Sequence, residues 1–392
     1  MRPGILIQHS RQQTQESELV RGDIAAILGV IPRRSWPRGA GQGDFIDLPL
    51  TSWRDLAESS VRELIDPITV RAVRAFFANE GERCHLIAVC IGSESDLAET
   101  SPLDGALRST LRHLCGLEHV GLLLMPLLAY LPLELDRLGR ATSAAEPMLL
   151  ALLEHCREMN SRFLIIDPPR DLHEGSLIGW TSRLRDAAGP SASHGALYYP
   201  WLMHGDDTFP PSGSVAGIFA RTELEHAPFG VRWPPANQVV NGVTHPAVPV
   251  RWRESDALIE AHINPILTQP ARGVVVWGAR TLSRDPRWTY INSRRIVSVV
   301  SEQLRRDSEW VVFEGQRPEL WETVIRTVRA RLDMIWGAGL LSGDQAGTEY
   351  EVQCDAELNP PEVRDAGQVH VRVLIKPIST TEHIVVDLRL GA

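Results

Sequence analysis

The sequence contains a single lysine, Lys376, among 392 residues, so nearly all of its 40 basic residues are arginines. Planar guanidinium groups bind carboxylates through paired hydrogen bonds, and this composition favours ion pairs at protein interfaces. Acidic residues number 49, which gives a formal net charge of −9. That balance argues against a general nucleic-acid-binding surface, although it leaves a local basic patch open.

Long apolar runs and paired cysteines are also lacking. The longest apolar run, residues 120–133, carries Pro126 and Pro132. It falls short of the roughly 20 residues that cross a bilayer, so we expect it in a protein core. No secretory signal pattern opens the chain. The five cysteines form no CxxC pair, which predicts reduced thiols in a cytosolic protein.

Composition and periodicity indicate an α/β protein. Hydrophobic residues make up 43% of the chain, enough for an ordered core, and the length favours two to three domains. A helical pattern over residues 67–77 leads into an apolar strand over residues 84–91, as in a βαβ unit. A leucine-rich strand–helix rhythm from about residue 92 to about residue 200 predicts a separate, inserted α/β domain.

The last quarter of the chain has clear periodic patterns. Apolar residues at spacings of three and four predict an amphipathic helix over residues 318–336. Strands are predicted over residues 350–358, 368–376 and 383–390. In the second of these strands Val369, Val371, Val373 and Ile375 alternate with polar residues. That alternation predicts one buried face and one wet face.

Motifs that would indicate catalysis are missing. The sequence has no GxSxG elbow, no HExxH pair and no glycine-rich phosphate loop. Potential metal ligands occur only as isolated pairs such as Cys84–His85. Neighbouring residues on a strand face opposite ways, so this pair is not expected to chelate a metal. We therefore predict no catalytic residue, no metal site and no cofactor.

Several blocks in the second half of the chain occur in a fixed order. The first is VVVWGARTLS (274–283), followed by WTYINSRR (288–295), WVVFE (310–314), WGAGL (336–340) and NP (359–360). Upstream lie PPSGSVAG (210–217) and PPAN (234–237), and PGILI (3–7) opens the chain. Together these blocks resemble the signature of the tail sheath proteins of contractile phages and of phage-tail-like contractile injection systems.

This resemblance implies an α/β (α+β) multidomain sheath-protein fold, with mixed sheets flanked by helices and with extended terminal arms. Residues 1–20 would form an N-terminal arm, and residues 379–392 a C-terminal arm strand. Residues 21–91 together with 205–378 would form the conserved core. Residues 92–204, which carry no recognisable signature, would form the inserted domain, and we expect that domain to face outward.

The implied function is mechanical. A sheath subunit polymerises helically around a rigid inner tube and contracts to drive the tube through a target envelope. Expected partners are copies of itself, the inner tube protein, and baseplate and terminator or cap proteins, with no nucleic acid and no stable membrane insertion. The protein would assemble in the bacterial cytoplasm and become part of a phage tail or injection particle.

Strands near both ends are candidate contacts between subunits, because an unpaired strand edge invites pairing with another chain. The alternative is that both strands fold back onto their own subunit. A charged face of the helix over residues 318–336 is a candidate contact with the tube or with adjoining subunits, or else a solvated surface. The predicted arm residues are Ile5, Leu6, Ile7, Ile384, Val386 and Leu388, and the predicted tube or sheath contacts are Arg326, Arg329 and Asp333.

Two other functions remain open at this point. The α/β rhythm alone allows a cytosolic enzyme with its active site in the middle domain, although a fold does not define a function. The chain also fits a sheath paralogue that forms one ring at an end of the particle.

Overall fold

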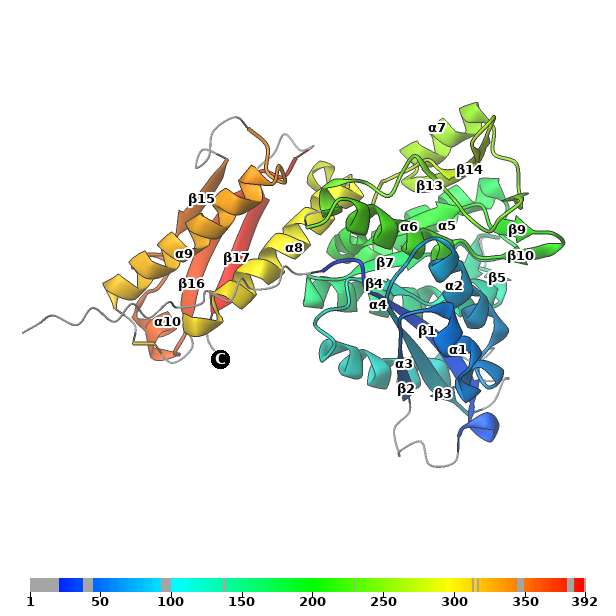
Figure 1. Cartoon of the computed structure of the whole chain (residues 1–392), viewed down its shortest axis with the longest axis horizontal. Helices are drawn as coiled ribbons and strands as arrows, with labels where there is room; N and C mark the ends of the chain where they lie inside the picture. Colours follow the sequence, from blue (N-terminus) through cyan, green and yellow to red (C-terminus); the bar gives the residue numbers. More distant parts are fainter. Residues whose placement is uncertain are drawn as a thin grey trace, which may run out of the picture.

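The computed structural model describes residues 21–37, 45–92, 100–136, 139–228, 230–311, 314–315, 317–343, 349–378 and 384–390. These residues form a larger lobe, which extends to about residue 290, and a smaller C-terminal lobe beside it (Figure 1). The predicted N-terminal arm lies outside the described residues. No helix within the described ranges is long and apolar enough to cross a membrane.

A nine-stranded mixed sheet forms the centre of the larger lobe. Six adjacent strands, β3, β1, β4, β7, β8 and β13, run parallel, and β2 and β14 flank them in antiparallel orientation. In spatial order the strands are β11 (Gln238–Val239), β14 (Gly273–Val276), β13 (Ile263–Gln269), β8 (Gly195–Tyr199), β7 (Phe163–Ile166), β4 (Leu122–Leu124), β1 (Ala25–Pro32), β3 (Cys84–Ile91) and β2 (Phe45–Leu50).

Helices cover both faces of this sheet, so its central strands are apolar on both sides, as expected for a parallel sheet. Within β1, Leu28 packs toward one core and Ile27 toward the other. The first core contains residues of α3 (Thr100–Cys115), α4 (Glu146–Met159), α5 (Glu174–Ala188) and α7 (Trp252–Glu260). The second contains residues of α1 (Trp53–Ala57), α2 (Pro67–Ala78) and α6 (Ser212–Glu225).

Local chemistry fixes the start of α2 and its packing. The Asp66 side chain accepts a hydrogen bond from the Thr69 backbone N–H at 2.8 Å, which caps the helix. Helix α6 approaches α2 closely because two of its residues are glycines. A Cβ atom added at Gly213 would lie 2.5 Å from the Ala72 carbonyl oxygen, and one added at Gly217 would lie 2.4 Å from the Phe76 carbonyl oxygen.

The middle of the chain does not form a separate domain, contrary to the prediction for residues 92–204. Strands β4, β7 and β8 come from this range, yet they lie between β1 and β13 in the same sheet. Each of them has a buried apolar face on both sides, so removing them would divide the sheet and both cores. The strand–helix rhythm was interpreted correctly as α/β, but it carries no information on which strands become neighbours.

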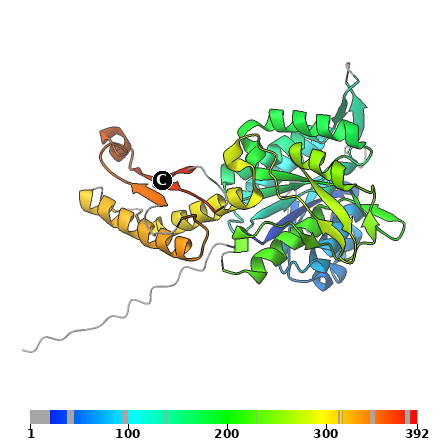
Figure 2. The same ribbon diagram turned by 90° about the horizontal axis from the view of Figure 1, so that it is seen from above.

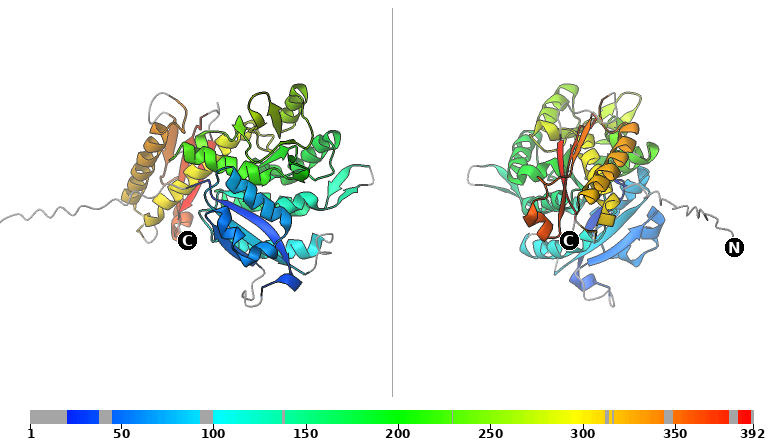
Figure 3. Two further views of the ribbon diagram at one scale, coloured as in Figure 1. Left: turned by 45° about the vertical axis from the view of Figure 1, so that its right-hand side comes forward. Right: turned by 90° about the vertical axis from the view of Figure 1, so that its left-hand side faces the viewer.

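The larger lobe also contains smaller elements outside its main sheet. A hairpin of β5 (Leu133–Leu135) and β6 (Ala141–Ser143) projects from it, and the Leu135 side chain is 74% exposed (Figure 3). A three-stranded sheet joins β10 (Asp207–Phe209), β9 (Leu202–His204) and β12 (His245–Pro246). Short 3-10 helices span Arg33–Ser35, Ser60–Glu63, Pro126–Tyr130, Gly189–His194, Gly230–Arg232, Pro286–Trp288 and Glu309–Val311.

The C-terminal lobe has two layers (Figure 2). One consists of α8 (Ile291–Asp307) and α9 (Pro318–Gly337); the other is an antiparallel sheet of β15 (Tyr350–Gln353), β16 (Val369–Ile375) and β17 (Ile384–Leu390), with α10 (Pro361–Asp365) at one end. Alternate residues of β16 are buried from Val369 to Ile375, which confirms the predicted pattern of one buried face and one wetter face. The predicted helix over residues 318–336 is α9, and Val328 and Leu332 are buried on its apolar stripe.

Candidate functional site

The sheet of the C-terminal lobe has two open edges. Strand β16 lies in the middle, and each outer strand has β16 as its only strand neighbour within the described ranges. Outer edges present backbone N–H and C=O groups that another strand can pair with. The sheet is therefore built to accept an additional strand at β15, at β17 or at both.

The short strand β15 leaves part of β16 without a strand partner, and Asn359 fills that gap. Strand β15 pairs only with Arg372 to Ile375. Beyond it, the Asn359 side chain accepts a hydrogen bond from the His370 N–H at 2.6 Å and donates one to the His370 carbonyl oxygen at 3.0 Å. The same amide donates to the Asp355 carbonyl oxygen at 3.0 Å. Asn359 is fully buried, so it completes the hydrogen bonding of β16 from inside the lobe.

Strand β17 pairs with β16 of the same chain in the described structure. The register places Ile384, Val386 and Leu388 opposite Ile375, Val373 and Val371. This is the fold-back arrangement that the sequence left open as the alternative to exchange between subunits. Exchange in an assembly stays a prediction, and Ile5, Leu6 and Ile7 lie outside the described residues.

Buried arginines of α8 join the two lobes. Arg295 forms an ion pair with Glu223 of α6 and donates a hydrogen bond to the Gly22 carbonyl oxygen at 2.7 Å. Arg294 donates to the Asn160 side chain at 2.6 Å and lies 4.3 Å from the centre of the Trp288 ring. The first half of α8 is thus fixed to the body of the protein.

Electrostatics at this junction reflect its burial. Burial raises the pKa of Glu223 to about 7, against the lowering effect of Arg295. Burial also lowers the pKa of Arg294 to about 9. Arg294 and Arg295 are only 5% and 6% exposed, so both side chains are part of the buried junction and not of the protein surface.

The junction also fixes where the chain enters the fold. Arg21 and Asp23 form an ion pair at 2.6 Å, and Gly22 between them contacts Arg295 and Glu223. The described part of the chain therefore begins beside α8 (Figure 1).

The three predicted contact residues of α9 lie on its exposed face. Arg326, Arg329 and Asp333 are all exposed, at spacings of three and four that place them on one side of a helix. Asp333 accepts a hydrogen bond from the Tyr350 hydroxyl at 2.5 Å, which links α9 to β15. Met334, 57% exposed, is also on this surface. Sequence reasoning identified this face through its charge, but its contact with a tube stays a prediction.

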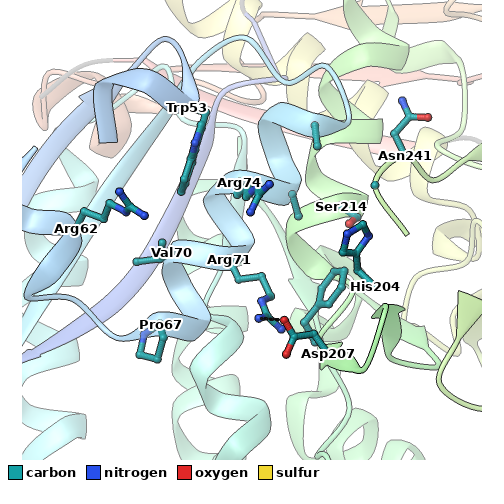
Figure 4. Close-up of a pocket in the computed structure, with 14 residues that line it drawn as sticks. Trp53, Arg62, Pro67, Val70, Arg71, Arg74, His204, Asp207, Ser214 and Asn241 are labelled. Carbon is teal, nitrogen blue, oxygen red and sulfur yellow. Dashed lines mark hydrogen bonds and ion pairs between the residues drawn. The ribbon is translucent and has the colours of Figure 1, made fainter. Parts of the chain in front are cut away.

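A separate groove lies over α2 in the larger lobe (Figure 4). It has a volume of about 360 Å³. Arg62 and Arg74 lie 5.9 and 6.0 Å from the centre of the Trp53 ring, and Arg71 forms an ion pair with Asp207 at 2.7 Å. Sequence reasoning missed this groove because its residues come from distant segments.

The groove has no activated nucleophile in the described part of the chain. Ser214 lines it, but the Ser214 hydroxyl is buried without a hydrogen-bond partner there. Activation of a serine requires a base within hydrogen-bond reach. The groove is thus a basic and aromatic surface rather than a nucleophilic active site.

Comparison with protein-family models decides the family. Residues 141–282 match the model of the phage tail sheath protein central domain, and residues 283–391 match that of the phage tail sheath C-terminal domain. The chain belongs to the phage tail sheath protein family. The boundary between the two family models, after residue 282, lies eight residues before α8 begins at Ile291, whereas neither predicted limit of the inserted domain coincides with a family boundary.

Curated relatives agree with this assignment. The chain is 26% identical over 178 residues to a putative prophage major tail sheath protein of Pseudomonas aeruginosa (strain UCBPP-PA14), over 44% of this chain and 44% of that protein. It is 27% identical over 183 residues to the tail sheath protein of Enterobacteria phage T4, over 45% of this chain and 26% of that protein. The matches span less than half the length of these relatives.

Solved structures share the whole fold. The contracted helical sheath of the anti-feeding prophage matches with a TM-score of 0.69 and 22% identity, over 98% of both chains. The contracted PVC sheath of an extracellular contractile injection system matches with a TM-score of 0.69 and 23% identity, over 99% of this chain and 97% of that chain. These findings confirm the predicted sheath-protein fold, and they leave the enzyme alternative without support, because family and neighbours are structural sheath proteins.

Proposed function

We propose that this protein is a structural subunit of a contractile sheath, which polymerises helically around a rigid inner tube and contracts to drive the tube through a target envelope. The observation that carries the proposal is the C-terminal lobe. Among the described residues the outer strands of its sheet pair only with β16, and Gly22 at the start of the described chain contacts Arg295 of α8.

Both terminal segments would then act as connecting arms. The strand over residues 384–390 of one subunit would leave its own β16 and pair with β16 of a neighbour, while Ile5, Leu6 and Ile7 would add to an open edge of another subunit. Backbone hydrogen bonds supply the affinity in such strand addition. Exchange costs little net pairing energy, because each β16 loses one strand and gains an equivalent one.

Strand exchange permits large movements without dissociation. Arg295 fixes the first half of α8 to the body through Glu223 and Gly22, so each subunit would move as one unit. The arms keep neighbours linked while exposed, arginine-rich surfaces change partners. A gain of even a few kcal/mol per subunit in the contracted state multiplies over many copies.

A disulfide test separates exchange from fold-back. His370 and Arg389 are paired in the β16–β17 register, and H370C/R389C places two cysteines there. The exposed Cys115 is changed to serine in every variant. Oxidation of assembled material should give a ladder of covalent oligomers on a non-reducing gel. H370C alone is the control and should give no ladder, and a disulfide confined to single chains in assembled H370C/R389C would contradict exchange.

The exposed face of α9 is the proposed contact with the inner tube or with adjoining subunits. Arg326 and Arg329 contribute two positive charges to this face, and both are exposed. R326E/R329E should fold normally but should reduce loading of sheath onto tubes in a co-sedimentation assay. R54E, on an exposed helix of the other lobe, is the matched control. Wild-type loading by R326E/R329E would exclude this role.

Further partners follow from the sheath interpretation. We expect contacts with baseplate and terminator or cap proteins at the two ends of the particle, and assembly in the bacterial cytoplasm. One solved structure similar to this chain belongs to the baseplate of the anti-feeding prophage. A role as an end-ring paralogue is therefore the second candidate, and immunogold labelling along whole particles would distinguish a continuous sheath from a ring at one end.

A further inference from the structure

Four side chains with metal-binding or proton-binding groups meet at the outer edge of the large sheet. Asp47 of β2 accepts hydrogen bonds from two imidazoles, His85 Nδ1 at 2.8 Å and His113 Nε2 at 2.9 Å. His119, in the loop between α3 and β4, approaches from outside. The Nε2 atoms of His85 and His119 lie 2.8 Å apart.

The fold explains this convergence. Asp47 and His85 lie two residues apart diagonally across the β2–β3 pair, since Asp47 pairs with Ile87 and Pro49 with His85. Both side chains extend toward α3, which supplies His113, and the His113 ring stacks on Phe45 with ring centres 4.2 Å apart. Three separate segments therefore fix the positions of His85 and Asp47.

The hydrogen bonds determine which nitrogen of His85 is free. The Asp47 carboxylate can only accept, so His85 carries its proton on Nδ1. This leaves the lone pair of His85 Nε2 as the acceptor of the hydrogen bond from His119 Nε2–H. Asp47 is suited to this task, because hydrogen bonds from His85 and His113 outweigh the effect of burial and lower its pKa. A carboxylate that orients an imidazole in this way is the usual outer partner of a metal-binding histidine.

We propose that His85 and His119 form a two-histidine site for a divalent transition-metal ion of the nickel or copper type. Metal–imidazole bonds are about 2.0–2.1 Å long, so two ligand nitrogens that form a 90° angle at the metal lie about 2.9 Å apart. The observed separation of 2.8 Å is close to this value. A tetrahedral zinc ion would need the two nitrogens to move apart to about 3.4 Å, so right-angled coordination fits better.

The site is accessible and has vacant positions for other ligands. His119 is exposed, and the His85 side chain is 14% exposed. No group of three or more potential ligands gathers in a metal-binding arrangement in the described part of the chain. Water, or a side chain from a second copy of the chain, would complete the coordination. On binding, His119 would shift its single proton from Nε2 to Nδ1 through solvent, and this shift frees its Nε2 lone pair for the metal ion.

Calorimetric titration of the untagged full-length protein with Ni²⁺ tests the site. One saturable site per chain is expected at neutral pH. H119A removes an exposed loop residue and should weaken binding at least tenfold, as should H85A. D47N keeps the shape but loses the charge that orients His85, and should weaken binding about tenfold.

Matched controls make the result decisive. H245A removes an exposed histidine on β12 and should leave Ni²⁺ affinity unchanged. H119A and H245A should melt within the error of the wild type in EDTA, since both residues are exposed. Ni²⁺ should raise the melting temperature of the wild type but not of H119A. No saturable Ni²⁺ site, or equal affinity in the wild type and H119A, would overturn the proposal.

Discussion

Replacing Asn359 with alanine tests how the gap beside β16 is closed. The substitution removes three side-chain hydrogen bonds to the backbone, two with His370 and one with the Asp355 carbonyl oxygen. It also removes a weaker one to the Cys354 sulfur at 3.8 Å. A buried hydrogen bond contributes about 1 kcal/mol, and an orphaned buried backbone group costs a similar amount or more. Because Asn359 is fully buried, water does not replace the lost partners. We expect a loss of about 3 kcal/mol from the stability of the C-terminal lobe.

Hydrogen exchange followed by mass spectrometry measures this loss directly. The free energy of opening for peptides that cover residues 366–376 should fall by about 3 kcal/mol in N359A, while peptides of β1 and β3 should keep their protection. Q353A is the matched control. It removes a single, partly exposed hydrogen bond to Asp355 in the same lobe, and its effect should stay below about 0.5 kcal/mol. A change of less than 1 kcal/mol in N359A would refute the role assigned to Asn359.

Three further outcomes are expected. Thermal unfolding should show that G217A lowers the free energy of unfolding by about 1–3 kcal/mol, because the new Cβ would lie 2.4 Å from a backbone oxygen of α2. G175A is the control and should not lower it, because nothing lies within 4 Å of a Cβ at that position. Burial raises the pKa of Asp167 to about 7, so the folded state binds a proton that the unfolded state has released. Stability should therefore fall as pH rises from about 4 to about 7. In D167N the melting temperature should fall less over this pH range. The same pH profile in D167N and the wild type would contradict this role of Asp167. R326E/R329E should melt at the wild-type temperature, since both arginines are exposed, and a large drop would mean that the pair is structural.

Local elements with strong periodicity could be predicted from the sequence. Apolar positions at helical spacing identified α9, and alternation from Val369 to Ile375 identified the wet and buried faces of β16. Cys84 is buried in one core while His85 lies on the opposite side of β3, which agrees with the expectation that this pair would not chelate a metal.

Contacts between distant segments could not be predicted in this way. The order of strands in the large sheet depends on which apolar faces meet, and the pattern of β4, β7 and β8 does not encode their position between β1 and β13. Arg294 and Arg295 follow a sequence pattern typical of a charged surface. They are buried because α8 packs against Glu223, Asn160 and Trp288, residues separated from them by up to 134 positions.

For the candidate surfaces too, local sequence patterns predict exposed charges but not the contacts between distant segments. The charges of α9 sufficed to select Arg326, Arg329 and Asp333 as exposed residues. Nothing in the local sequence around His85 and His119 indicates that their imidazoles meet, because 34 residues separate them. The groove beside Trp53 likewise combines segments that only the fold brings together.

Electron microscopy of the purified full-length protein, alone and with its tube partner, tests the central claim most directly. A subunit that works by exchanging strands with its neighbours should form striated tubes or hollow polysheaths, and deletion of residues 1–18 should leave a folded protein that forms neither. Uniform small particles from the full-length protein under every condition, or normal tubes from the deletion variant, would contradict this account.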